Sequence, residues 1–196
     1  MSNNNIGYVQ VYTGNGKGKT TAALGITMRA SGAGMKVAFI QFMKALGYSE
    51  QKILPTLPGV AWKTLGKPFF IAKAGSISEE DLAGYGDACV VFEEGNPPAD
   101  YVKMIHDGFE DAKEMVLSGS YDMVVLDEIN CAMFFGLIPV SDVLELIKSK
   151  PAHTELILTG RCAPEEIIEA ADLVTEMREI KHYYNEGVPA RRGIED

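Results

Sequence analysis

The amino-acid sequence predicts an α/β fold in which a mostly parallel sheet carries helices on both faces. Short apolar, β-branched runs alternate along the chain with segments whose apolar residues recur at helical spacing, which is typical of strand–helix–strand units with right-handed crossovers. Residues 123–126 are continuously apolar, as expected for a strand buried on both faces of a parallel sheet. Because the chain has 196 residues, we expect a single domain spanning residues 1–196.

The first part of the chain contains three predicted strands and one clear helix. Residues 6–12 form the first apolar strand, and the helical pattern after it ends at residues 31–34, whose glycines suit a left-handed cap. Residues 37–42 form a second short apolar strand. Residues 59–65 form a third, with a glycine at either side.

Regular pattern is weak between residues 45 and 98. This variable segment contains a predicted short helix, capped by Ser76 with Glu79 three places on, and a short apolar run at residues 89–92. A stretch of this length with little regular pattern inside a compact domain is commonly a binding loop or lid. We therefore expect residues 45–98 to supply loops beside a ligand.

Regular pattern returns after residue 98. In residues 99–119 the apolar positions step by three and four, which predicts an amphipathic helix packed on the sheet. A strand at residues 123–126 follows. The remaining predicted elements are a helix after Ser141, a strand at residues 156–158, a helix begun by Pro164 and its two following glutamates, and a strand at residues 173–177.

The segment between the first strand and the first helix, residues 13–21, matches a phosphate-binding P-loop. Its glycines let backbone N–H groups converge on phosphate oxygens, and the positive end of the helix dipole adds to that field. The first glycine of the pattern stands one place late, at Gly14, and the alternative is a turn that merely joins strand to helix. We expect a P-loop NTPase-like (RecA-like) nucleotide site. Its predicted contacts are Gly14, Asn15, Gly16, Lys17, Gly18, Lys19, Thr20 and Thr21.

An acidic pair, Asp127 and Glu128, ends the buried strand. Mg²⁺ bound to phosphates requires hard oxygen ligands, so these carboxylates and the Thr20 hydroxyl are the predicted magnesium ligands. Lys44 and Arg161 also lie at strand ends, where ligands bind in open α/β sheets. Each is a candidate phosphate contact. The alternatives are a solvated side chain for the lysine and a structural ion pair with a neighbouring acid for the arginine.

Composition and charge exclude several function classes. The formal net charge of −9 argues against a nucleic-acid-binding surface. The 3 cysteines are odd in number and form no C-x-x-C pair, so neither a disulfide framework nor a zinc site is predicted. We find no N-terminal signal pattern and no apolar run of membrane length, and we expect a cytoplasmic protein with no membrane partner.

Five short segments are specific when taken together: Val11 to Ala23, Gln41 to Lys44, Val124 to Asn130, Leu158 to Arg161 and Ala171 to Arg178. As a set they resemble the P-loop family of ATP:corrinoid adenosyltransferases, which includes the cob(I)alamin and cob(I)yrinic acid a,c-diamide enzymes. Lys181, His182 and residues 187–195 also resemble the C-terminus of that family. The resemblance covers residues 6–44 and 120–196 in order.

The resemblance implies that the 5′-deoxyadenosyl group of ATP moves to the Co(I) centre of a corrinoid, with triphosphate as the leaving group. It implies that Lys17 and Lys19, with the loop amides and Mg²⁺, neutralise that leaving group. Apolar side chains would keep water and the lower cobalt ligand away; the candidates are Phe69 and Phe70, with Trp62, and core packing is the alternative for each. A homodimer and a flavoprotein reductant are also implied.

The sequence departs from the family pattern where the corrinoid would bind. Family members usually carry a Phe-x-Trp stretch after the strand that matches residues 59–65, whereas residues 69–71 here are Phe-Phe-Ile and residues 66–98 diverge. Two other function classes therefore stay open. A P-loop phosphohydrolase or kinase would release ADP and phosphate, and a nucleotide-binding regulatory protein would bind ATP without turnover.

Overall fold

The computed structural model describes residues 6–76 and 79–195, whose central element is a six-stranded sheet. The strand order is β3-β2-β6-β7-β1-β8, and every neighbouring pair is parallel. The predicted parallel sheet is thus confirmed. Its strands are β1 (Val9–Thr13), β2 (Val37–Phe42), β3 (Val60–Leu65), β6 (Met123–Asp127), β7 (Glu155–Thr159) and β8 (Leu173–Glu176).

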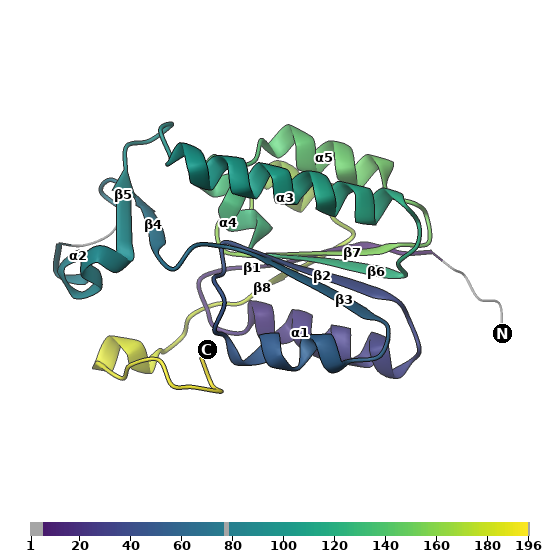
Figure 1. Ribbon diagram of the computed structural model, residues 1–196, viewed down its shortest axis with the longest axis horizontal. Coiled ribbons are helices and arrows are strands. Elements are labelled where there is room, and N and C mark those ends of the chain that lie inside the picture. The colour runs from purple at the N-terminus through teal and green to yellow at the C-terminus, as the bar shows by residue number, and fades with distance from the viewer. Residues whose placement is uncertain (1–5, 77–78, 196) are drawn as a thin grey trace.

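Helices cover both faces of the sheet, as the sequence predicts (Figure 1). One face carries α1 (Lys19–Gly32) and the short 3₁₀ helices η1 (Ser49–Lys52) and η2 (Leu54–Thr56). The opposite face carries α3 (Ala99–Leu117), α4 (Ile129–Phe134), α5 (Val140–Ser149) and α6 (Glu165–Ala170).

Two apolar cores lie on the two faces of the sheet, because successive side chains of a strand point to opposite sides. On β2, Ile40 belongs to the core under α3 to α6, whereas its neighbour Phe39 belongs to the core against α1. The predicted apolar face of α3 is confirmed, since Ile105, Phe109 and Val116 are all fully buried. Removal of these side chains from water is the main force that holds the layers together.

A second, separate sheet was not predicted. It consists of β4 (Phe70–Lys73) and β5 (Cys89–Phe92), which pair in parallel and are joined by α2 (Glu79–Tyr85) and η3 (Gly86–Ala88). The Ser76 hydroxyl donates to the Lys73 carbonyl, and residues 77–78, which would follow the predicted Ser76 cap, lie outside the described residues. The β4–β5 pair projects beyond the main sheet in Figure 1.

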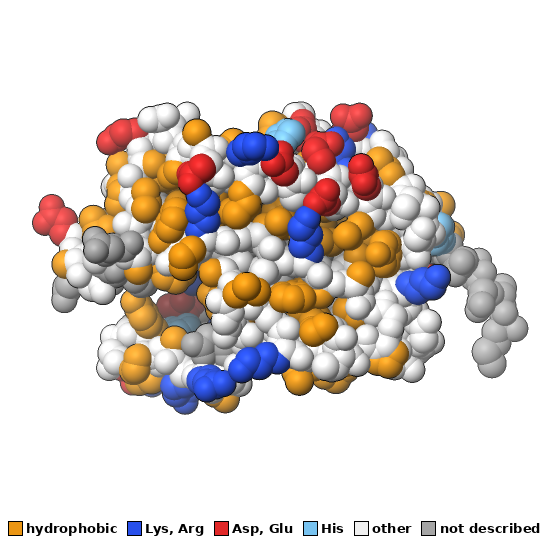
Figure 2. Space-filling view, in the orientation of Figure 1, with side chains coloured by type: hydrophobic (Ala, Val, Ile, Leu, Met, Phe, Trp, Pro, Cys, Tyr) orange, Lys and Arg blue, Asp and Glu red, His pale blue; other side chains and the backbone are white. Residues whose placement is uncertain are grey.

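The carboxyl ends of the main strands meet at one edge of the sheet. Register pairs Gln41 of β2 with Asp127 of β6, and Tyr12 of β1 with Thr159 of β7, so the segments after these strands lie together. The C-terminal segment, which contains η4 (Tyr183–Glu186), lies below this edge in Figure 1, opposite the β4–β5 pair. Figure 2 shows the surface hollowed between the two. Within the described ranges, no helix is both long and apolar enough to cross a membrane.

Candidate nucleotide-binding site

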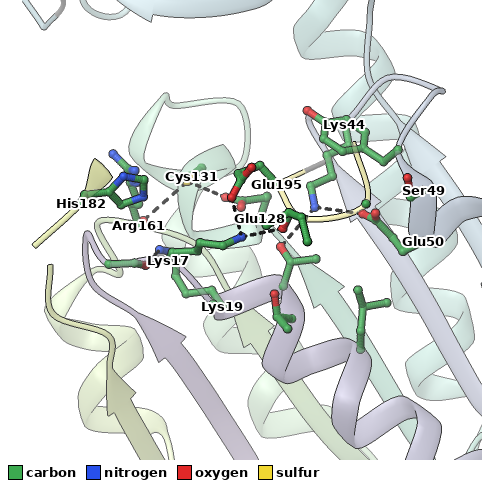
Figure 3. Close-up of a pocket in the computed structure, with 18 of the residues that line it drawn as sticks. Lys17, Lys19, Lys44, Ser49, Glu50, Glu128, Cys131, Arg161, His182 and Glu195 are labelled. Carbon is green, nitrogen blue, oxygen red and sulfur yellow. Dashed lines mark hydrogen bonds and ion pairs between the residues drawn. The ribbon is translucent and has the colours of Figure 1, made fainter. Parts of the chain in front are cut away.

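A pocket with a volume of about 710 Å³ opens at the carboxyl edge of the sheet (Figure 3). It brings together most of the residues that the sequence singled out: Gly16, Lys17, Gly18, Lys19, Thr20, Thr21, Lys44, Phe70, Glu128 and Arg161. The other predicted residues, Gly14, Asn15, Asp127 and Phe69, do not line it. Sequence reasoning did not propose the other lining side chains as site residues: Leu24, Tyr48, Ser49, Glu50, Cys131, His182, Ile194 and Glu195.

The phosphate loop joins the end of β1 to the start of α1. Gly14 (φ 93°) and Gly18 (φ 121°) both adopt the left-handed backbone conformation that glycine reaches without steric cost. The loop is held against the residue after β8, because the Gly16 N–H donates to the Met177 carbonyl at 2.6 Å. The N–H groups in the first turn of α1, from Lys19 onward, have no helical acceptor, so an anion in the pocket can accept from them.

The Lys19 side chain is buried within the phosphate loop. Its ammonium donates to the carbonyls of Gly14 at 2.7 Å and Gly16 at 2.8 Å. Burial lowers the pKa of Lys19, and the nearby Arg161 guanidinium lowers it further, although the carboxylates of Glu128 and Asp127 act in the opposite direction. Among the described residues, the groups at hydrogen-bond distance from the Lys19 ammonium are therefore neutral carbonyls.

Lys17 contacts the C-terminal segment. Its ammonium donates to the Ile194 carbonyl at 2.7 Å and lies 3.8 Å from a carboxylate oxygen of Glu195. Glu195 in turn accepts hydrogen bonds from the Arg191 guanidinium and from the Tyr183 hydroxyl. These bonds hold the pKa of Glu195 well below its usual range, at about 2. The end of the chain thus forms one wall of the pocket, and it places a carboxylate next to a phosphate-loop lysine.

Asp127 is fully buried beneath the pocket and is the centre of a polar network. Its carboxylate accepts hydrogen bonds from the hydroxyls of Thr20 at 3.0 Å and Thr159 at 2.7 Å. It also pairs with the Lys44 ammonium at 3.0 Å. The predicted proximity of Thr20 and Asp127 is therefore present in the structure, and both side chains offer oxygen atoms to a cation.

Glu128 follows Asp127 in a left-handed conformation, with φ of 64°. This turn directs its side chain into the pocket lining, while its N–H donates to the Thr159 hydroxyl at 2.9 Å. The Cys131 thiol donates to the Glu128 carboxylate at 2.9 Å. Burial and the neighbouring Asp127 carboxylate raise the pKa of Glu128, and burial likewise raises the pKa of the Cys131 thiol. The Glu128 carboxylate thus lacks a cation at hydrogen-bond distance in the described part of the chain.

Lys44 is not the solvated lysine of the alternative interpretation. Only 13% of its side chain is exposed, and its ammonium contacts the Asp127 carboxylate at 3.0 Å, the Thr20 hydroxyl at 3.1 Å and the Glu50 carboxylate at 3.5 Å. Burial opposes the charge, but the attraction of Asp127, Glu128 and Glu50 outweighs it and raises the pKa of Lys44. The ammonium is therefore a firmly held internal cation.

The remaining candidates differ in their surroundings. Arg161 is exposed at the pocket and makes no ion pair with Glu128, or with any other acid that the structure describes. Phe70 lines the pocket with 55% of its surface exposed, whereas the Phe69 ring packs on the ring of Tyr101 with centroids 5.8 Å apart. Trp62 lies outside the lining and its indole N–H donates to the Gln41 side chain at 3.3 Å. Phe70 is the aromatic candidate that reaches the pocket.

Comparison with known proteins identifies the family. The model of the family described as "ATP:corrinoid adenosyltransferase BtuR/CobO/CobP" matches residues 5–195. The chain belongs to this family. A "Corrinoid adenosyltransferase" of Escherichia coli (strain K12) is 33% identical over 189 residues, covering 96% of this chain and 85% of that protein. A protein of the same name from Sinorhizobium sp is 36% identical over 193 residues, covering 96% and 80%.

A third relative in the corrinoid adenosyltransferase family matches this chain over a similar length. "Corrinoid adenosyltransferase CobA" of Salmonella typhimurium is 32% identical over 189 residues, covering 96% of this chain and 85% of that protein. The family description names ATP and a corrinoid as the two reactants. The family match is wider than the motifs alone indicated, because it includes residues 45–119 as well as the phosphate loop and the acidic strand end.

Proposed function

We propose that this corrinoid adenosyltransferase family member transfers the 5′-deoxyadenosyl group of ATP to the Co(I) centre of a corrinoid and releases triphosphate. The observation that carries the proposal is the family match over residues 5–195, in a chain whose phosphate loop lines a pocket of about 710 Å³. Fold alone does not name a reaction, since kinases and phosphohydrolases also contain phosphate loops.

In the proposed reaction the cobalt electron pair attacks the ribose C5′ carbon. The C5′–O5′ bond breaks, and its electron pair leaves with the triphosphate oxygen, so no protein group has to remove a proton. The protein must stabilise the charge of the leaving group. The N–H groups at the start of α1 can do so, together with Lys17, Lys19 and Arg161, which reach the pocket from two different strand ends.

We propose that Thr20, Asp127 and Glu128 hold a magnesium ion that neutralises part of the polyphosphate charge. The donor set fits this hard cation: Thr20 and Glu128 line the pocket, and the carboxylate of the buried Asp127 beneath it lies 3.0 Å from the Thr20 hydroxyl. A cationic group, the Lys44 ammonium, already lies within 3.1 Å of both Thr20 and Asp127, which supports a cation-binding role for these oxygens.

We place the corrinoid on the side of the pocket formed by the variable segment, residues 45–98. Phe70 on β4 supports this placement, because its exposed ring lies in the pocket lining and offers an apolar surface that excludes water. Phe69 is partly buried against the core, and we assign it to the support of β4 rather than to contact with the corrinoid. The flavoprotein reductant, the homodimer and the cytoplasmic location stay predictions.

The products of ATP turnover test the proposal. The protein is incubated with ATP and Mg²⁺, with and without chemically reduced cob(I)alamin, and the phosphate products are separated by anion-exchange chromatography. We expect triphosphate, formed only with the reduced corrinoid and in equal amount to the adenosylated product. ADP and phosphate formed without corrinoid would instead indicate a phosphohydrolase, and ATP binding without turnover under any reductant would indicate a regulatory protein.

A further inference from the structure

Three oxygen-bearing side chains from three separate segments converge on the ammonium of Lys44. They are Asp127 at the end of β6 (3.0 Å), Thr20 in the first turn of α1 (3.1 Å) and Glu50 in η1 (3.5 Å). Figure 3 shows Lys44 and Glu50 facing one another beside the phosphate loop. Hydroxyl and carboxylate oxygens gathered around one positive charge are the surroundings that a hard metal ion requires.

Glu50 is held in this position by a network of amide side chains. The Gln41 amide donates to the Glu50 carboxylate at 3.1 Å and to the Asp127 carboxylate at 3.3 Å. One side chain therefore bridges the two carboxylates. Gln51 donates to the Gln41 oxygen at 3.2 Å and to the Ala45 carbonyl at 2.9 Å. Gln41 and Gln51 are both buried, and the position of Glu50 is therefore fixed by the fold rather than by solvent.

We propose that Lys44 is a tethered cation that occupies the magnesium site until Mg²⁺ arrives with the nucleotide, and that Glu50 is a further carboxylate of that site. Without a cation, the carboxylates of Asp127 and Glu50 would repel one another in surroundings shielded from water. The Lys44 ammonium holds them together with Thr20. Mg²⁺ carries twice its charge and displaces it.

The displaced ammonium stays at the pocket and is redirected to the polyphosphate. Lys44 lines the pocket, and its ammonium already lies 5.2 Å from the centre of the Tyr48 ring, an aromatic face that can receive a cation. Lys44 would thus act twice, first as a substitute for the metal and then as a contact of the leaving group. The inference rests on the proposed magnesium site, and it does not depend on which corrinoid is used.

Binding of Mn²⁺ to the nucleotide-free protein tests the first step. Electron paramagnetic resonance measures free Mn²⁺ in titrations of the wild type, Lys44→Met, Glu50→Gln and the double variant. We expect Lys44→Met to bind Mn²⁺ about tenfold or more tightly than the wild type, because the competing charge is gone. We expect the added Glu50→Gln change to reverse most of that gain. Equal Mn²⁺ affinity in the wild type and a folded Lys44→Met would overturn the proposal.

A matched control and a second readout keep the test decisive. Lys150→Met also removes a part-buried ammonium, one that donates to two carbonyls away from the pocket, and it should leave Mn²⁺ affinity unchanged. Removing one partner of a buried ion pair is destabilising, so Mn²⁺ should raise the melting temperature of Lys44→Met more than that of the wild type. No such difference would also count against the proposal.

If Lys44→Met does not fold, the Glu50→Gln variant alone tests the proposal. Calorimetry then measures ATP binding as a function of Mg²⁺ concentration, and we expect the half-saturating Mg²⁺ concentration to rise several-fold. An unchanged Mg²⁺ dependence would refute a metal-binding role for Glu50. Because none of these measurements uses a corrinoid, failure of adenosyl transfer and failure of this inference are distinguishable.

Discussion

The ammonium of Lys17 donates a hydrogen bond of 2.7 Å to the main-chain carbonyl of Ile194, 177 positions further along the chain. This bond joins the phosphate loop to the C-terminal segment, which also lines the pocket through Glu195. If Lys17 contacts the polyphosphate as proposed, the polyphosphate and the C-terminal segment compete for the same ammonium. Lys17 would then couple nucleotide binding to the position of the C-terminal segment.

Lys19 should contribute most of the ATP affinity among the loop side chains. We expect Lys19→Ala to raise the dissociation constant for ATP roughly ten- to hundredfold, because charge-assisted hydrogen bonds to phosphate are lost. Isothermal titration calorimetry measures the change. Lys150→Ala is the matched control, since its ammonium also donates to two carbonyls, those of Gly7 and Thr154. Unchanged ATP affinity in Lys19→Ala would contradict the assignment of the loop.

The attachment of the C-terminal segment should depend on pH through Glu195. Its pKa is lowered from 4.5 to about 2 by the hydrogen bonds from Arg191 and Tyr183. Because the pKa of Glu195 is lower in the folded protein than in the unfolded chain, its hydrogen bonds stabilise the fold fully above the unfolded pKa of about 4.5. This stabilisation is lost as pH falls from about 4.5 toward about 2. Carboxylate ¹³C chemical shifts, measured by NMR from pH 7 to pH 2, follow this titration.

Tyr183→Phe removes one of the donors to Glu195, so the pKa of Glu195 should rise toward its ordinary value in this variant. The stabilisation is then smaller, and its loss is complete at a higher pH than in the wild type. Tyr184→Phe is the control, because Tyr184 is the adjacent exposed tyrosine and should leave the Glu195 titration where it is. Identical Glu195 titrations in all three proteins would show that the Tyr183 hydroxyl does not stabilise the carboxylate.

Gly14 should tolerate no side chain. Its φ of 93° disfavours other residues, and an added Cβ would lie 2.5 Å from the Met177 carbonyl oxygen. We expect Gly14→Ala to lower the free energy of unfolding by more than about 1 kcal/mol. Gly25→Ala is the control, since nothing lies near an added Cβ and alanine favours the helix interior by about 1 kcal/mol. Urea denaturation compares the two, and equal stabilities would show that the loop can shift.

Substitutions of the adjacent residues Phe69 and Phe70 should have different effects, one on stability and the other on function. Phe70→Ala removes an exposed ring from the pocket, so we expect a stability change within about 0.5 kcal/mol together with a raised KM for the corrinoid. Phe69→Ala removes the contact with Tyr101 and should destabilise by about 2 kcal/mol. Thermal unfolding and steady-state kinetics measure both. A normal corrinoid KM in Phe70→Ala would place the acceptor elsewhere.

Local patterns predicted the sheet and the phosphate loop because their signals lie within a few residues of each other. The glycines of residues 14–18 and the apolar β1 are adjacent, and the buried β6 leads directly to Asp127. The contact between Lys44 and Asp127 has the same kind of origin. Both residues lie at the carboxyl ends of strands, and β2 and β6 are neighbouring parallel strands. The sequence therefore predicted which residues lie at this edge of the sheet.

Local sequence patterns did not predict several other features. The α4 helix begins at Ile129, one residue after β6 ends, and its six residues are too few to show a helical period. The β4 strand has four residues, too few to show a period. Glu50 lies in a segment without pattern, and its position depends on Gln41 from another element. The contact of Lys17 with Ile194 is set by the tertiary fold alone.

The hydrogen bond from Gly16 to Met177 makes the first loop of the protein dependent on its last strand. During synthesis on the ribosome, residues 14–18 emerge early but lack this support until residue 177 has left the exit tunnel. β1 must also wait for both of its sheet neighbours, β7 and β8, which are the last two strands of the described residues. The candidate nucleotide site of a nascent chain can therefore form only after β7, β8 and Met177 have emerged.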